Sequence, residues 1–312
     1  MKNKIALICP YFGTFPNYFN LFIKSCAYNS NYTWIIITDN CFTIKEQIPN
    51  NVKFINMTFD NIKDFIQAKF DFNICLDYPY KLCDFKPCYG YIFEDLLADY
   101  DFWGHCDLDC IYGDISKFIN DDILEKYDKI SFLGHFTLYR NKKNINEYFK
   151  TEINKYKFDY KKILSSPKGY AFDESFNSLS LNTIFIENNI PFYQKQIFAD
   201  VCCLFKDFRL YNYDKCLNFH LERKSNQIFK WDNGTLVSIK KINGKIKEKE
   251  YAYIHLQKRK MKLNIDINEK KYLIVPNAFV PYIDPQIALK KYKTLIPFSK
   301  KLIDLKFFTK KG

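Results

Sequence analysis

Two aspartates, Asp107 and Asp109, are the residues whose type and spacing point most directly to chemistry. They stand one residue apart, just after an apolar, strand-like run that follows Tyr100. Carboxylates are rarely buried unless they are paired or bound to a cation. In an open α/β sheet, ligands bind just beyond the carboxyl ends of strands. An Asp-x-Asp at that place predicts hard oxygen ligands for Mg²⁺ or Mn²⁺, completed by a diphosphate; the alternative is a solvated turn.

The elements that must position these aspartates are predicted from short apolar runs that end in turn residues. Apolar residues at helical spacing predict three helices. The first follows Thr14 and Pro16, the second contains Ile62 and Ile66, and the third begins at Asp84, which we interpret as its N-cap. The predicted strands are Lys4–Cys9, Trp34–Thr38, Val52–Met57 and the run before Asp107. This order predicts an α/β fold with a mostly parallel, Rossmann-like, doubly wound sheet.

The second half of the chain has a mixed pattern. Lys129–Leu138 is predicted to be one strand, and Glu174–Asn189 a helix that opens after Asp173. Residues 228–256 are rich in β-forming runs, separated by Asn233-Gly234 and Asn243-Gly244, which are typical of hairpin turns. We therefore expect a catalytic domain over residues 1–262, with a hairpin-rich part, and a basic amphipathic tail over residues 263–312.

Composition narrows the class of protein. The chain has 312 residues, 47% of them hydrophobic, so it can bury a sizeable core. Its net charge of +12 indicates an anionic partner: a nucleotide sugar, an acidic lipid surface or nucleic acid. Most aromatic residues fall at core-like positions and no recognition motif occurs, which disfavours nucleic-acid binding.

Cysteine usage and hydropathy predict a cytoplasmic protein. The 11 cysteines are odd in number and irregularly spaced, without a C-x-x-C pair, which favours reduced thiols in the core. The first apolar run is too short for a secretory signal, and no run has the length of about 18 residues that spans a membrane.

Six short motifs follow one another along the chain, and their order and spacing matter more than any one of them. They are Pro10-Tyr11-Phe12-Gly13, Thr38-Asp39, the segment Lys81–Pro87, the segment Gly104–Asp109, Phe172-Asp173-Glu174, and the segment His255–Arg259. The set resembles the bacterial glycosyltransferases of GT-A fold found in capsule and lipopolysaccharide gene clusters, over about Lys4 to Met261. The resemblance implies a GT-A-like fold and a metal-dependent transfer of a sugar from a nucleoside-diphosphate donor to a hydroxyl.

The resemblance also implies the donor-binding residues. The loop after the first strand would hold the nucleotide, through Pro10, Tyr11, Phe12 and Gly13. Asp39 would hold the uracil or the ribose. The alternatives are an ordinary strand-to-helix turn for the loop and an Asx-turn for Asp39. Lys86 is predicted from its own position to face the diphosphate, because the macrodipole disfavours a cation at a helix N-terminus.

The metal site and the catalytic carboxylate complete the expected set. Asp109 is predicted to bind the metal ion, Mn²⁺ or Mg²⁺, and Asp107 to share the metal or the ribose. The resemblance implies that His255 completes the metal site, while Lys258 and Arg259 hold the diphosphate. The alternative is a histidine at a strand end beside a solvated run of charge.

On the acceptor side, the resemblance places a carboxylate at Asp173 or Glu174, and both the choice and the stereochemical outcome stay open. One acidic residue in a first helical turn would also be ordinary.

The sequence therefore predicts a metal-dependent glycosyltransferase that acts on a glycan or lipid-linked glycan, a precursor of a surface polysaccharide. Nucleotidyl or phosphosugar transfer on the same fold is the alternative, and a basic nucleic-acid-binding protein ranks below both. The lysine-rich tail from Ile283 is predicted either to lie on the anionic inner face of the cytoplasmic membrane or to pack as a helix on the catalytic domain.

Overall fold

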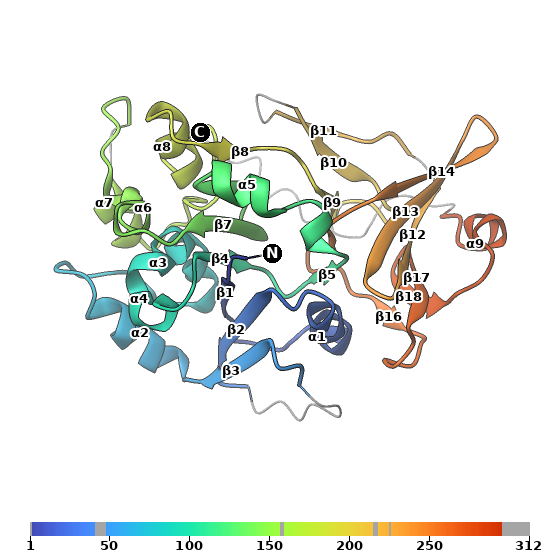
Figure 1. Ribbon diagram of the computed structural model, residues 1–312, viewed down its shortest axis with the longest axis horizontal. Coiled ribbons are helices and arrows are strands. Elements are labelled where there is room, and N and C mark those ends of the chain that lie inside the picture. The colour runs from blue at the N-terminus through green and yellow to red at the C-terminus, as the bar shows by residue number, and fades with distance from the viewer. Residues whose placement is uncertain (1, 41–47, 157–158, 215–217, 225, 295–312) are drawn as a thin grey trace. The chain divides into compact units, whose positions relative to one another are not determined.

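The computed structural model describes residues 2–40, 48–156, 159–214, 218–224 and 226–294 (Figure 1). The chain forms two compact units. The first unit comprises residues 1–15, 30–108 and 119–195, and the second comprises 16–29, 109–118 and the chain from 196 on. The chain thus divides between Leu108 and Asp109, inside the Asp-x-Asp motif, and not at the predicted boundary after residue 262. Sequence runs could not indicate this, because each unit is assembled from several separate segments.

The first unit is built around a seven-stranded sheet of order β3-β2-β1-β4-β7-β6-β8. Its strands are β1 (Ile5–Pro10), β2 (Tyr32–Thr38), β3 (Val52–Asn56), β4 (Phe102–Cys106), β6 (Lys129–Leu133), β7 (Phe136–Arg140) and β8 (Phe192–Tyr193). Neighbours among β3, β2, β1 and β4 pair in parallel, but β7 pairs antiparallel with both β4 and β6. β6 and β8 pair in parallel again. The fold is therefore mixed α/β, and β7 is the strand that interrupts the parallel arrangement.

The burial of the central strands explains their apolar sequences. Ile5, Ala6, Leu7 and Ile8 have no exposed surface, and a strand covered on both faces is encoded as a continuous apolar run. The sheet and its helices enclose one large apolar cluster that includes Trp103, which lies in β4. The helices of this unit are α2 (Phe59–Gln67), α3 (Tyr89–Ile92), α4 (Glu94–Leu97), α5 (Asp121–Lys126), α6 (Lys143–Asn146), α7 (Tyr160–Leu164) and α8 (Leu181–Glu187), with 3₁₀ helices η1 (Pro79–Cys88) and η3 (Tyr148–Lys150).

Three sequence predictions in this unit are wrong. Lys129–Leu138 is not one strand but the hairpin β6–β7, with Gly134 and His135 between the strands. The helix predicted from Glu174 begins only at Leu181, because Ser180 forms a capping box with Thr183. Asp84 is not an N-cap: it lies inside η1.

The second unit contains two sheets. The five-stranded sheet has the order β11-β10-β9-β15-β5, and the six-stranded sheet β14-β13-β12-β17-β18-β16. The strands are β5 (Cys110–Tyr112), β9 (Phe198–Val201), β10 (Leu210–Tyr213), β11 (Phe219–Leu221), β12 (Gln227–Asp232), β13 (Thr235–Ile242), β14 (Lys245–Glu250), β15 (Tyr253–His255), β16 (Lys262–Leu263), β17 (Lys271–Val275) and β18 (Ala278–Pro281). The unit also holds α1 (Phe19–Ala27) and η2 (Ile115–Lys117). The helix predicted after Pro16 thus begins only at Phe19.

The hairpin-rich part is found where the sequence predicts it. Asn233-Gly234 joins β12 to β13, and Asn243-Gly244 joins β13 to β14. All four residues have positive φ angles, between 48° and 84°. Two consecutive residues of positive φ define the type I′ turn that matches the twist of a hairpin.

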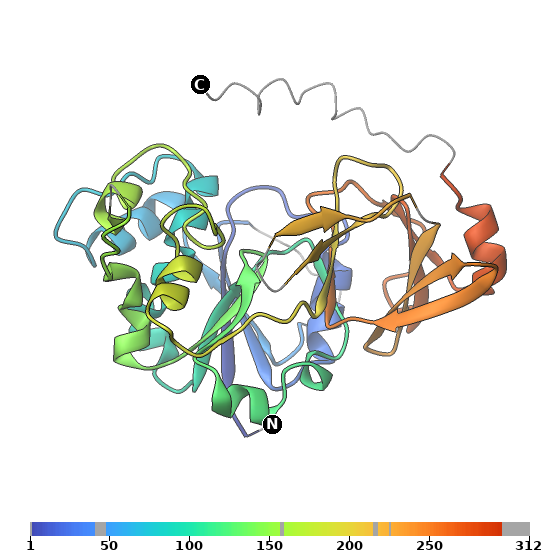
Figure 2. The same cartoon turned by 90° about the horizontal axis from the view of Figure 1, so that it is seen from above.

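The predicted tail is largely part of the second unit. Strands β17 and β18 lie within its first twenty residues, and β16 begins one residue before it. Helix α9 (Pro285–Lys291) packs on β12 and β13 with Ala288 and Leu289 buried (Figure 2). The described part of the tail therefore follows the packed-helix alternative and gives no support to membrane contact. The lysines from Lys300 onward lie outside the described residues. Among the described residues, no helix is long and apolar enough to cross a membrane.

Candidate functional site

Most predicted donor-binding residues of the first unit lie at one edge of its sheet. β1 ends at Pro10, β2 at Thr38 and β4 at Cys106, and these strands run in parallel. Their carboxyl ends therefore meet at the same edge, where ligands of α/β sheets bind. The loop from Pro10 to Gly13, Asp39 and Asp107 all follow these strand ends.

The nucleotide loop has features that suit a ligand. Gly13 has a φ of +142°, and an added Cβ there would meet no heavy atom within 4 Å, so this backbone stands open. Asn40 Nδ2 donates a hydrogen bond to the Gly13 carbonyl at 2.7 Å and holds the loop beside the end of β2. Tyr11 stacks on Phe15, and Phe12 packs edge-on against Phe59. Asp39 is exposed.

Lys86 is the central cation of the first-unit group. It lies in the last turn of η1, not at a helix N-terminus, so the dipole argument for its role is wrong. Its buried ammonium forms ion pairs with Asp107 Oδ1 at 2.8 Å and Asp173 Oδ2 at 3.6 Å. Burial lowers the pKa of Lys86, but these carboxylates outweigh burial and hold the pKa well above its ordinary value.

Asp173 and Glu174 lie in the loop before α8 and differ in accessibility. Asp173 is 4% exposed, whereas Glu174 is half-buried. Burial raises the pKa of Asp173 well above its ordinary value; the Glu174 carboxylate adds to this, and Lys86 opposes it. Glu174 Oε2 accepts a hydrogen bond from the Gly134 backbone N–H at 2.9 Å.

Gly134, between β6 and β7, connects these groups. Its carbonyl accepts hydrogen bonds from Lys86 Nζ at 2.9 Å and lies 3.0 Å from His105 Nδ1. A Cβ at this position would stand 2.2 Å from Asp173 Oδ2. Only glycine therefore lets Asp173 approach this backbone. His105 is fully buried, and burial holds its pKa well below the ordinary value, which fits a supporting core histidine.

In the second unit, Asp109 and His255 face each other. Asp109 stands immediately before β5, and His255 ends β15, the antiparallel neighbour of β5. His255 Nε2 lies 3.4 Å from Asp109 Oδ1, and both residues are buried. Burial lowers the pKa of His255, but the carboxylates of Asp109 and Asp200 prevail and raise it well above the ordinary value.

The backbone after His255 is bent toward Asp109. Gln257 and Lys258 have φ angles of 48° and 57°, a left-handed conformation that non-glycine residues rarely adopt. This bend aims the Lys258 N–H at Asp109 Oδ2, 2.5 Å away, while the Lys258 side chain stays exposed. Strained backbone of this kind collects at functional sites.

The resemblance implies that Arg259 holds the diphosphate, but its side chain is buried and bonds the protein backbone. Its guanidinium donates hydrogen bonds to the backbone carbonyls of Cys202, Phe205 and Lys206 and to Asn277 Oδ1. These contacts fix the chain after β9, so we remove Arg259 from the expected diphosphate ligands.

Sequence reasoning missed Asp200. This residue lies in β9, is 2% exposed, and contacts His255 Nδ1 at 2.8 Å. A signal was present, because Asp200 is the one carboxylate within the apolar run from Ile197 to Phe205. The sequence did not reveal its partner, which lies 55 residues further along the chain.

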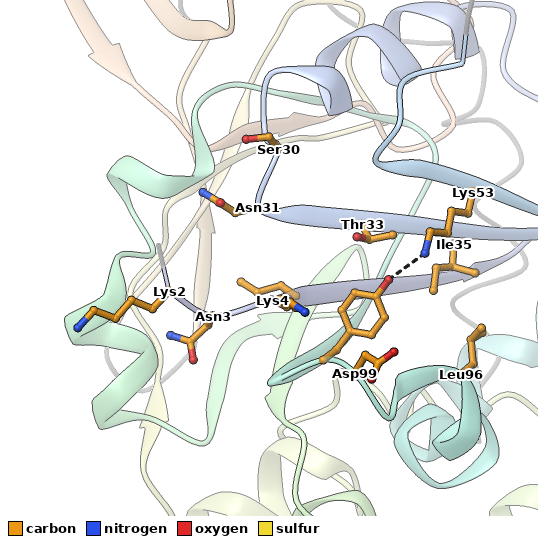
Figure 3. A pocket seen from close by; sticks show the side chains of 12 residues that line it. Lys2, Asn3, Lys4, Ser30, Asn31, Thr33, Ile35, Lys53, Leu96 and Asp99 are labelled. Atoms are coloured by element: carbon orange, nitrogen blue, oxygen red, sulfur yellow. Dashed lines mark hydrogen bonds between the residues drawn. The ribbon is translucent and has the colours of Figure 1, made fainter.

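A cavity of about 450 Å³ lies at the opposite edge of the first unit's sheet, near the amino ends of β1 and β2 (Figure 3). Lys2, Lys4, Lys53 and Asp99 stand on its wall and are exposed, and Lys53 Nζ donates to Tyr100 Oη at 3.3 Å. Its lining residues include none of the predicted site residues. The chemistry-bearing residues of this unit gather at the carboxyl edge instead.

The chain belongs to the family of unknown function DUF6625, because the family model matches residues 7–283. No curated protein matches the chain.

Similar solved structures include the galactosyltransferase LgtC in complex with donor and acceptor sugar analogues, with 9% identity, 63% of this chain and 75% of that chain covered, and a TM-score of 0.33. An active-site mutant of LgtC matches with 10% identity, 63% and 74% coverage, and the same TM-score of 0.33. Similarity at this level carries no argument about the activity of this chain.

Proposed function

We propose that this protein is a metal-dependent glycosyltransferase that uses a nucleoside-diphosphate sugar. The observation that carries the proposal is the pairing of Asp109 with His255, two buried side chains of the kinds that can bind a metal ion, whose atoms lie 3.4 Å apart. The resemblance of the six motifs to bacterial GT-A enzymes supports the same class.

The chemistry of the donor set suits a divalent cation. Carboxylate oxygen favours Mg²⁺ and Mn²⁺, whereas imidazole nitrogen favours the transition metals, so the pair favours Mn²⁺. Asp107 is joined to Asp109 through one residue, which limits the distance between their Cα atoms to about 7 Å. We therefore keep Asp107, Asp109 and His255 as the proposed ligands, with Asp109 and His255 as the principal ones. When bound, the cation would neutralise the departing diphosphate.

Lys258 is the proposed diphosphate ligand of the second unit. Its side chain is exposed, and its own N–H already binds Asp109. In the first unit, the loop from Pro10 to Gly13 and Asp39 are the proposed nucleotide ligands, since they occupy the carboxyl edge of the parallel strands. We propose for Lys86 the task of holding Asp107 and Asp173 in place, because its ammonium is enclosed by them.

Glu174 is the proposed carboxylate on the acceptor side. It is half-buried and so accessible to a hydroxyl, and the Gly134 N–H fixes one of its oxygens. Asp173 is more deeply buried and faces Lys86. A positioned carboxylate can accept the proton of the acceptor hydroxyl. The acceptor we propose is a hydroxyl of a surface glycan precursor.

The test is a panel of nucleotide sugars, nucleoside triphosphates and free nucleotides, screened with Mn²⁺ for an increase in melting temperature. A glycosyltransferase should be stabilised by one nucleoside-diphosphate sugar and should slowly release the nucleoside diphosphate from it. Pyrophosphate release from a nucleoside triphosphate would instead indicate nucleotidyl transfer. Absence of any Mn²⁺-dependent stabilisation across the panel would contradict the proposal.

A further inference from the structure

We infer that Asp200 is a positioning residue that orients His255 for cation binding, and this inference rests on the metal site of the proposed function. Asp200 Oδ1 lies 2.8 Å from His255 Nδ1, on the side of the ring away from Asp109. The carboxylate accepts the hydrogen of Nδ1, which leaves Nε2 directed at Asp109. A metal-binding histidine needs this arrangement, with one ring nitrogen held by an acceptor and the other available to the cation.

The strand register places Asp200 opposite His255, and Asp109 one residue from the position opposite His255 on the other side. β15 lies between β9 and β5, and His255 pairs with Asp200 on one side and with Cys110 on the other. Asp109 directly precedes Cys110, and its carbonyl accepts a hydrogen bond from Leu256 N at 2.9 Å. Backbone pairing therefore sets the order Asp200, His255, Asp109 before any side chain is considered.

Asp200 is itself held by two further donors. Gln257 Nε2 donates to Asp200 Oδ1 at 2.9 Å, and Tyr213 Oη donates to Asp200 Oδ2 at 3.1 Å. Both oxygens are thus oriented, and the carboxylate cannot turn without breaking these bonds. Gln257 is also the first of the two left-handed residues, so the bend that brings Lys258 N–H to Asp109 is tied to the same carboxylate.

A purely structural role for Asp200 is less consistent with these contacts. The backbone pairs β9 with β15 without help from side chains. A buried carboxylate is costly unless it is paired, and His255 is a partner that Asp200 contacts directly.

The experiment measures Mn²⁺ affinity without any substrate, by electron paramagnetic resonance of free Mn²⁺. Asp200→Asn keeps the shape of the side chain and removes its charge, and we expect the affinity to fall about 10- to 100-fold. The nitrogen-14 modulation of bound Mn²⁺, which reports imidazole ligation, should weaken in the same variant. A merely structural residue would not change that signal in folded protein.

A double-mutant cycle tests whether Asp200 affects Mn²⁺ binding through His255 or independently of it. If Asp200 acts through His255, Asp200→Asn should add no further loss of Mn²⁺ affinity to His255→Gln. Additive losses would overturn the inference. If Asp200→Asn does not fold, Tyr213→Phe and Gln257→Leu leave the carboxylate but remove one of its holders, and each should lower affinity about fivefold. Unchanged affinity in both would also overturn it.

The outcomes distinguish this inference from the proposed function. Wild-type protein that binds Mn²⁺ with nitrogen modulation, together with an unchanged Asp200→Asn variant, would overturn only the role of Asp200. Wild-type protein that binds no Mn²⁺, or binds it without nitrogen modulation, would overturn the metal site and with it this inference.

Discussion

The ammonium of Lys86 lies 2.8 Å from Asp107 Oδ1, so the first aspartate of the Asp-x-Asp motif is held by a buried cation from the preceding 3₁₀ helix. The same ammonium lies 3.6 Å from Asp173 Oδ2 and joins the motif to the loop that carries Glu174. One lysine thus connects two carboxylates that are 66 positions apart in the chain.

Replacing Lys86 should therefore damage both stability and transfer. In Lys86→Met, the buried Asp173 loses its cation, and breaking a buried pair costs about 3–5 kcal/mol. Asp107 also loses its partner, but its side chain is partly exposed, so solvent reduces that loss. We expect the free energy of unfolding, measured with urea, to fall by that order and transfer to fall at least about 10²-fold. Lys142→Met, at an exposed lysine, is the control. A stable, active Lys86→Met protein would show that the pair is dispensable.

Asp109 should be required for the cation. In Asp109→Asn, the charge beside His255 is lost, and the increase in melting temperature on adding Mn²⁺ should disappear. Transfer should fall about 10²-fold or more, as when other electrostatic stabilisers are removed. Asp99→Asn, at an exposed aspartate of the first unit, should behave like wild type. Full transfer in excess EDTA would contradict metal dependence.

Glu174 and Asp173 should respond differently to loss of charge. Glu174→Gln should lower kcat about 10²- to 10⁴-fold with little change in the KM of the donor, because a proton acceptor acts in the transition state. Asp173→Asn should lower kcat less and reduce stability more, since Asp173 is buried against Lys86. The reverse order would assign the acceptor side to Asp173, and Glu125→Gln serves as an exposed control.

Gly134→Ala tests the close approach at the β6–β7 turn. The added Cβ would stand 2.2 Å from Asp173 Oδ2, so the acceptor-side carboxylates must shift. A displacement of about 1 Å can cost 10²-fold in rate, and we expect that loss of transfer with Mn²⁺ affinity retained. Gly169→Ala is the matched control, because a Cβ there meets nothing within 4 Å. Equal rates in the two variants would exclude a role for the turn.

The buried side chain of Lys129 should make the free energy of unfolding depend on pH. Its fully buried Nζ donates hydrogen bonds to Ser131 O and Asn182 Oδ1. Burial lowers the pKa of Lys129 well below the ordinary value, and Asp173 opposes this. Between that folded pKa and the unfolded value of about 10.4, the unfolded chain binds more protons. Stability relative to Lys129→Met should therefore rise with pH, by at most about 1.4 kcal/mol per unit. Urea unfolding between pH 7 and 10 measures it, and a flat or falling difference contradicts it.

The sequence by itself determined the local elements of this protein. Continuous apolar runs gave β1 and β2, because strands buried on both faces need no alternation. The more exposed edge strand β3 was also found from its apolar residues. Asn-Gly pairs gave the two hairpin turns, because positive φ angles at both positions restrict the residue types. Asp109 and His255 were also recognisable as candidate ligands. Asp109 follows a strand-like run, His255 ends one, and both have side chains that can bind cations.

Only the tertiary structure decided what these residues contact. The antiparallel return of β7, the split of the motif between two units, and the buried bonds of Lys86 and Arg259 all depend on segments far apart in the chain. Asp200 came beside His255 because β9 and β15 pair in register, and no local pattern encodes that pairing. A side chain's type and spacing limit the chemistry it can do, but its burial and its partners arise only when distant strands meet.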